Sequence, residues 1–103
     1  MNDSASQGAA DAGIGALRRN LGIANKRGLH ARAAAKFVRT AGQFDSTVRV
    51  RFKGQEVSGL SIMGLMMLSA GIGSEIELVC SGRQAVEAMT ALSALVEGKF
   101  GED

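Results

Sequence analysis

The sequence has no proline, tryptophan or tyrosine, and only one cysteine, one histidine and four phenylalanines in 103 residues. With Cys80 as its single cysteine, the chain cannot form an intramolecular disulfide or a cysteine-rich metal cluster, and a reducing compartment is indicated. Proteins that bind RNA or single-stranded DNA usually stack bases on aromatic rings, which are scarce here. Since the net charge is only +2, we expect no nucleic acid partner.

The sequence also lacks targeting and membrane signals. Residues 1–15 are mostly Gly, Ala, Ser and Asp, without the basic and apolar segments of a signal peptide. We expect them to form a flexible N-terminal extension, followed by one domain at residues 16–103. No apolar run approaches the roughly 20 residues of a transmembrane helix. The sequence therefore predicts a cytoplasmic protein without membrane contact.

Acidic residues are scattered and form no recognisable catalytic pair or set of metal ligands. The residues considered were Asp45, Glu56, Glu75, Glu77 and Glu87. We accordingly expect neither a metal nor another cofactor.

Alternating apolar and polar residues predict four strands, and apolar residues at helical spacing predict three helices. The strands cover residues 17–24, 47–52, 55–58 and 75–80, and the helices begin at Ala31, at Ile62 and, after Gly82, at Ala85. A tight turn at Lys53 and Gly54 requires antiparallel pairing of the two middle strands. The predicted fold is α+β: an open-faced β-sandwich in which a four-stranded antiparallel sheet is covered on one face by three helices.

The helical patterns also predict which side chains are buried. In the first helix, Ala34, Phe37, Val38 and Ala41 share one face, whereas Ala33 lies off this stripe. In the second helix, apolar residues are too numerous for one buried face. Its methionines, Met63, Met66 and Met67, either fill the core, which is the usual role at this spacing, or lie exposed as an adaptable partner surface.

The only histidine, His30, lies in Gly28-Leu29-His30-Ala31-Arg32, where a loop meets the first helix. Glycine lets the backbone approach closely, the helix start offers free N–H groups, and the arginine supplies a planar cation suited to phosphate oxygens. A neutral imidazole can attack phosphorus without a separate base. We therefore predict a phosphoryl site at His30; the alternative is a structural cap or a buried, hydrogen-bonded histidine.

Two motifs, Gly28-Leu29-His30-Ala31-Arg32 and Ser61-Ile62-Met63-Gly64-Leu65-Met66, resemble those of the HPr family, the histidine-containing phosphocarriers of the bacterial phosphoenolpyruvate-dependent phosphotransferase system. The resemblance spans residues 17–98 and implies an open-faced β-sandwich. It also implies that enzyme I, charged from phosphoenolpyruvate, phosphorylates Nδ1 of His30, that Arg32 stabilises the phosphate, and that an enzyme IIA receives the group. Such a protein is a carrier without turnover of its own.

Ser61 has two compatible roles. A serine before an apolar helix is usually an N-cap, which contributes about 1 kcal/mol. The resemblance implies in addition a regulatory phosphorylation of Ser61 by an HPr kinase/phosphorylase. It further implies that partners dock around His30 and the second helix, for which we expect Ile62, Met63 and Met66 to provide the contact surface.

One position departs from the family pattern, because Ala33 replaces the proline that usually follows the arginine. Alanine preserves helix formation, so we expect altered phosphoryl transfer and not its loss. The sequence leaves open whether the relay serves sugar uptake or the nitrogen-related branch. It also leaves open an alternative, an HPr-like regulatory protein that controls target proteins through its phosphorylation state. We expect a monomer in either case.

Overall fold

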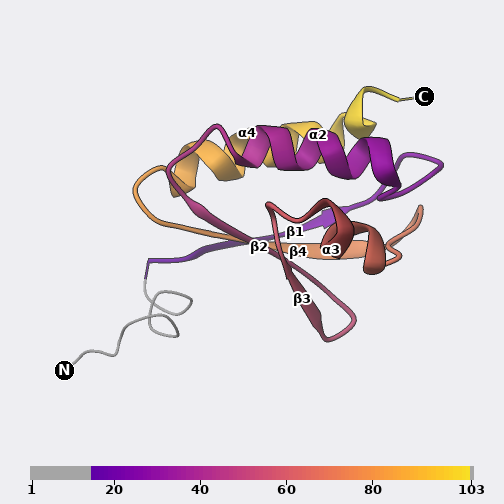
Figure 1. Ribbon diagram of the computed structural model, residues 1–103, viewed down its shortest axis with the longest axis horizontal. Helices are drawn as coiled ribbons and strands as arrows, with labels where there is room; N and C mark the ends of the chain where they lie inside the picture. Colours follow the sequence, from indigo (N-terminus) through magenta and orange to yellow (C-terminus); the bar gives the residue numbers. More distant parts are fainter. Residues whose placement is uncertain (1–14, 103) are drawn as a thin grey trace.

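A computed structural model describes residues 15–102, so the expected extension at residues 1–15 lies outside the described residues except for Gly15. The elements in chain order are β1 (Leu17–Gly22), α2 (Ala31–Ala41), β2 (Thr47–Phe52), β3 (Gln55–Ser58), α3 (Ile62–Met67), β4 (Glu75–Ser81), α4 (Ala85–Glu97) and the 3-10 helix η1 (Lys99–Gly101). Figure 1 shows α2 and α4 together over one face of the sheet, with α3 at the end where α2 begins. This arrangement confirms the predicted open-faced α+β sandwich.

The sheet has the strand order β1-β4-β2-β3, and all three pairings are antiparallel. The central strand β4 pairs with β1 at Leu17 and Cys80 and with β2 at Val50 and Leu78. The last strand in the sequence therefore joins the first strand to the central hairpin.

Two strand boundaries differ from the prediction. β1 ends at Gly22, two residues before the predicted end, and β4 continues to Ser81. Beyond Gly22 the chain still runs beside the segment that precedes β4, where Ile23 exchanges backbone hydrogen bonds with Ser74 and Gly73 at 2.8 Å each. Ile23 is buried although it lies beyond the end of β1. The alternation of apolar residues therefore extends past the strand, which is why the predicted strand is too long.

The helices and the sheet enclose one core. Its largest fully buried side chains include Phe37, Phe100, Leu65, Ile76, Leu78 and Leu92. Cys80 is buried as expected, and burial raises the pKa of its thiol to about 11. No thiolate is therefore present near neutral pH.

The buried face of α2 is wider than predicted. Ala34, Phe37 and Ala41 are buried, but so is Ala33, which we had placed off the stripe, while Val38 is only half-buried. The reason is that α2, which lies over one face of the sheet (Figure 1), also packs against α3 and α4. A helix covered by several neighbours buries more than one stripe.

The open face of the sheet carries charged side chains that neutralise one another. The Arg51 guanidinium donates hydrogen bonds to Glu56 at 2.6 Å and to Glu77 at 3.3 Å. Oε2 of the same Glu56 lies 3.2 Å from Nη1 of Arg49.

Within residues 15–102, none of the helices has the length and apolar character that crossing a membrane requires.

Candidate functional site

The loop before α2 is held against the segment that follows α3. Gly28 has a φ of +64°, and a Cβ atom there would lie 2.4 Å from the carbonyl oxygen of Ala70 and 2.7 Å from Cα of Gly71. The next residue, Leu29, is buried and donates its backbone N–H to the same Ala70 oxygen at 3.0 Å. Only glycine fits this approach, and the contact fixes the backbone just before His30.

His30 is the N-cap residue of α2, but its side chain makes no capping hydrogen bond. The first backbone bond of the helix runs from the Ala34 N–H to the His30 carbonyl oxygen at 2.8 Å. The N–H groups of Ala31, Arg32 and Ala33 therefore precede the helical ladder and give this end a partial positive charge. No acidic residue lies in the first turn. This geometry rules out the side-chain cap, and the N–H groups of the first turn give the helix start a partial positive charge of the kind that attracts anions.

The imidazole of His30 is hydrogen-bonded to a residue near the other end of the chain. Its Nε2 atom lies 2.5 Å from Oε2 of Glu102, and the two side chains are only 14% and 19% exposed. The second carboxylate oxygen, Oε1, accepts a hydrogen bond from Nδ2 of Asn25 at 3.0 Å. Asn25 is fully buried and also donates to the carbonyl oxygen of Gly28 at 2.8 Å.

These contacts determine the ionisation of Glu102. Burial raises the pKa of the carboxyl group, but the hydrogen bonds from Asn25 and His30 and the nearby charge of Lys36 outweigh it, so the pKa lies below its ordinary value. Glu102 is therefore a carboxylate at neutral pH. The sequence did not predict a role for Asn25 or Glu102 in this site. Glu102 lies 72 residues after His30, and no spacing or motif connects either residue with the histidine.

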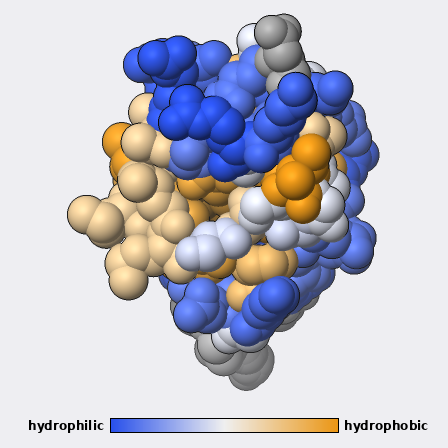
Figure 2. Space-filling model, turned by 90° about the vertical axis from the view of Figure 1, so that its right-hand side faces the viewer, coloured by the Kyte–Doolittle hydropathy of each residue, from blue (hydrophilic) through white to orange (hydrophobic). Residues whose placement is uncertain are grey.

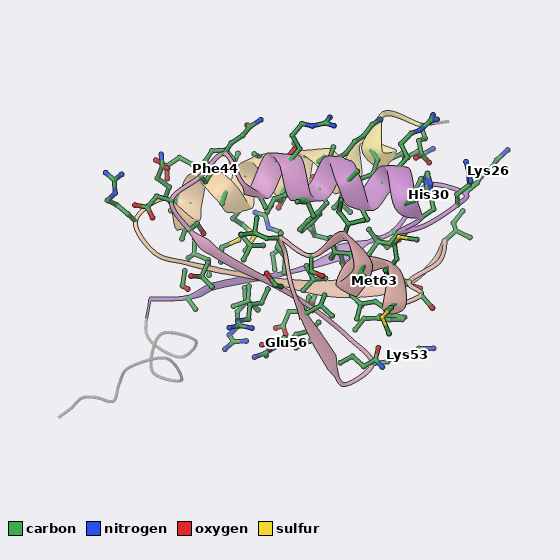
Figure 3. The ribbon with its side chains drawn as sticks, in the orientation of Figure 1. Lys26, His30, Phe44, Lys53, Glu56 and Met63 are labelled. Atoms are coloured by element: carbon green, nitrogen blue, oxygen red, sulfur yellow. The ribbon has the colours of Figure 1, made fainter. Side chains whose placement is uncertain are left out.

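Three cationic side chains surround this pair. Lys26, Arg27 and Arg32 line a pocket of about 240 Å³ together with His30 and Glu102, and Figure 3 shows Lys26 and His30 at the same end of the molecule. A larger hollow of about 420 Å³ lies on the open face of the sheet, where Arg51 is already paired. Among residues 15–102, no group of His, Cys, Asp and Glu side chains is arranged to hold a metal ion. The cations and the helix start make the smaller pocket the better site for a phosphoryl group.

Ser61 begins the neighbouring helix α3. Its Oγ accepts a hydrogen bond from the backbone N–H of Gly64 at 2.9 Å, which confirms the predicted N-cap. Ser61 is half-buried and does not line the His30 pocket. The structure thus shows its capping role and not a contact with the predicted phosphoryl acceptor.

The methionines of α3 lie mostly outside the core. Met63 and Met67 are 68% and 70% exposed, whereas Leu65 is the buried residue of this helix. Ile62 and Met66 are also exposed. Because α3 has only six residues, a single side chain suffices to anchor it, and the core interpretation of these methionines is wrong. Figure 2, which faces this end, shows apolar side chains next to a polar region.

Comparison with known proteins gives a consistent result. Residues 17–98 match the family described as "PTS HPr component phosphorylation site". The chain is 51% identical to Phosphocarrier protein HPr of Cupriavidus necator, over 84% of this chain and 97% of that protein. It is 42% identical to Phosphocarrier protein NPr of Shewanella violacea, over 84% and 94%. The crystal structure of HPr-C-His from Thermoanaerobacter tengcongensis superposes with a TM-score of 0.81 at 42% identity, over 84% of this chain and 98% of that one.

Proposed function

The chain belongs to the HPr family and is a phosphocarrier of the phosphotransferase system, and we propose that His30 is the residue on which it carries the phosphoryl group. The observation that supports this most directly is the position of His30: a partly buried imidazole at a helix N-terminus in a pocket with three cationic side chains. A phosphoryl group brings negative charge, which this pocket is arranged to receive.

The transfer uses the two ring nitrogens differently. Nε2 is engaged with Glu102, so Nδ1 is the nitrogen that bonds to phosphorus. Arg32 and the N–H groups that precede the helical ladder stabilise the phosphoryl oxygens. Catalysis of this kind depends on positioning and electrostatics, and the carrier itself has no independent turnover.

Enzyme I as donor and an enzyme IIA as acceptor are the partners that membership of the family implies. We assign their docking surface to Ile62, Met63 and Met66, which are exposed on α3. Flexible thioethers adapt to several partners, and the cations around His30 favour acidic partner surfaces. Similarity to both HPr and NPr proteins supports the relay, with the nitrogen-related branch included, and does not favour the purely regulatory alternative.

A second proposed site is Ser61, as a substrate of an HPr kinase/phosphorylase. A phosphate on its Oγ would add charge next to Ile62 and Met63 and so weaken docking through the apolar surface. We also propose that the protein is a cytoplasmic monomer and that phosphorylation controls further target proteins. The single buried cysteine supports a reducing compartment.

The carrier function is tested by intact-mass analysis of wild type and His30→Ala after incubation with enzyme I, phosphoenolpyruvate and Mg²⁺. We expect one phosphoryl adduct on wild type, lost on brief acid treatment, and none on the variant. A wild-type protein that stays unmodified with its own, demonstrably charged enzyme I would refute the relay. An adduct that persists in His30→Ala would refute the assignment of the acceptor.

A further inference from the structure

Glu102 reaches His30 because the chain makes a left-handed turn after α4. Lys99, Phe100 and Gly101 have φ values of 59°, 56° and 75°. A non-glycine residue in this conformation is strained, so surrounding contacts must hold the turn. Phe100 is fully buried, and its carbonyl oxygen accepts a hydrogen bond from Lys36 at 2.7 Å.

The backbone and the buried asparagine complete this support. The N–H of Glu102 donates to the Lys99 carbonyl oxygen at 2.9 Å, which closes the turn. Asn25 then holds Oε1 and leaves Oε2 facing the imidazole. Hydrogen bonds to both the backbone and the side chain of Glu102 therefore fix the position of its carboxylate.

The charge state of Glu102 determines where the imidazole carries its proton. An ionised carboxylate accepts hydrogen bonds and cannot donate them. Nε2 must therefore be the donor in the 2.5 Å contact, and in the neutral ring Nδ1 then holds the free electron pair. The hydrogen bonds from Asn25 and His30 and the nearby charge of Lys36 keep the carboxylate ionised, and the cationic side chains of Lys26, Arg27 and Arg32 line the same pocket.

We propose that Glu102 is a positioning residue that fixes the tautomer and orientation of His30, so that Nδ1 presents its electron pair to the phosphoryl donor. This inference rests on the proposed function. It assigns a role to a residue four positions beyond the end of the family match at residue 98.

The transfer step is balanced as follows. The Nδ1 electron pair forms the N–P bond, and the bond from phosphorus to the donor breaks, with its electron pair leaving on the donor group. The proton stays on Nε2, so the phosphorylated ring becomes an imidazolium whose positive charge lies against the Glu102 carboxylate. The carboxylate thus stabilises the product as well as selecting the reactive tautomer.

The test compares wild type with Glu102→Gln and Glu102→Ala. Glu97→Gln is the matched control, because Glu97 is exposed on α4 and the substitution removes the same charge. Each protein is first checked for folding by thermal unfolding. The ¹⁵N shifts of the His30 ring, the only imidazole in the chain, then report the tautomer, and the initial rate of phosphorylation by charged enzyme I reports the transfer.

We expect wild type and Glu97→Gln to show protonated Nε2 and equal rates. The Glu102 variants should show mixed tautomers and rates about 10- to 100-fold lower, the loss usual when an orienting partner is removed. Folded Glu102 variants with wild-type tautomer or wild-type rate would overturn the positioning role alone, because the carrier function would remain. If wild type itself accepts no phosphoryl group, both proposals fail together.

Discussion

The contact between Gly28 and the segment after α3 leads to a prediction about stability. In Gly28→Ala, the new Cβ would lie 2.4 Å from the Ala70 oxygen and 2.7 Å from Cα of Gly71. Both are backbone atoms, so relief of the clash requires one loop to move. That movement lengthens the hydrogen bond from the Leu29 N–H to the Ala70 oxygen, now 3.0 Å.

The magnitude follows from these contributions. Alanine at positive φ costs about 1 kcal/mol, the weakened hydrogen bond about 1 kcal/mol, and the displaced packing of buried Leu29 and Ala70 about 1 kcal/mol more. We expect Gly28→Ala to lower the free energy of unfolding by about 2–4 kcal/mol. The corresponding fall in Tm is roughly 10–25 °C for a domain of this size.

Gly54 provides the matched control. It also has a positive φ, +80°, but a Cβ there would meet nothing within 4 Å. Gly54→Ala should therefore show only the conformational cost of about 1 kcal/mol. Urea unfolding followed by far-ultraviolet circular dichroism measures both variants, since the chain has no tryptophan for fluorescence. If the two variants lose the same stability, the close approach at Gly28 contributes nothing and this reasoning is wrong.

Three further predictions concern single side chains. Ser61→Ala should lower the free energy of unfolding by about 1 kcal/mol, because it removes the N-cap of α3. Ser61→Asp should keep the cap but slow the phosphorylation of the protein by enzyme I. Equal rates of phosphorylation for Ser61→Asp and wild type would contradict docking through the apolar surface of α3. The Cys80 thiol, whose pKa burial raises to about 11, should react with a thiol reagent at pH 8 only after denaturation, and fast reaction of the native protein would contradict its burial. The folded-state pKa of Glu102 lies below the ordinary value of a glutamate carboxyl, so its stabilising effect is full above that ordinary value and is lost as the pH falls through the folded-state pKa. Urea unfolding at several pH values should therefore show the stabilities of wild type and Glu102→Gln converging in acid. A difference that stays constant with pH would contradict this prediction.

The sequence predicted the element order, the sheet type and the capping role of Ser61, because each depends on local patterns. Alternation and helical spacing report which face of an element is apolar. They do not report how many neighbours cover that face, so they predict Ala33 off the buried stripe and allow two interpretations of the α3 methionines. In both cases the deciding factor is packing between elements.

His30, Gly28 and Arg32 were found in the sequence because they share one short motif, whereas the role of Lys26 and Arg27 in lining the same pocket came from the structure. Asn25 and Glu102 were not found in the sequence, since their hydrogen bond joins residues 77 apart and depends on a turn with two non-glycine residues at positive φ, Lys99 and Phe100. Such a turn runs against intrinsic backbone preference and is held by tertiary contacts. The part of the site that depends on chain reversal therefore required the structure.

The central place of β4 constrains when the protein can fold during its synthesis. Until Glu75–Ser81 has left the ribosome, β1 has no neighbouring strand and only the β2–β3 hairpin can pair. An isolated hairpin is marginally stable in water, so folding of the sheet must wait until β4 is released. Glu102 emerges later still, and the nascent chain therefore acquires a complete His30 site only after residue 102 has left the ribosome.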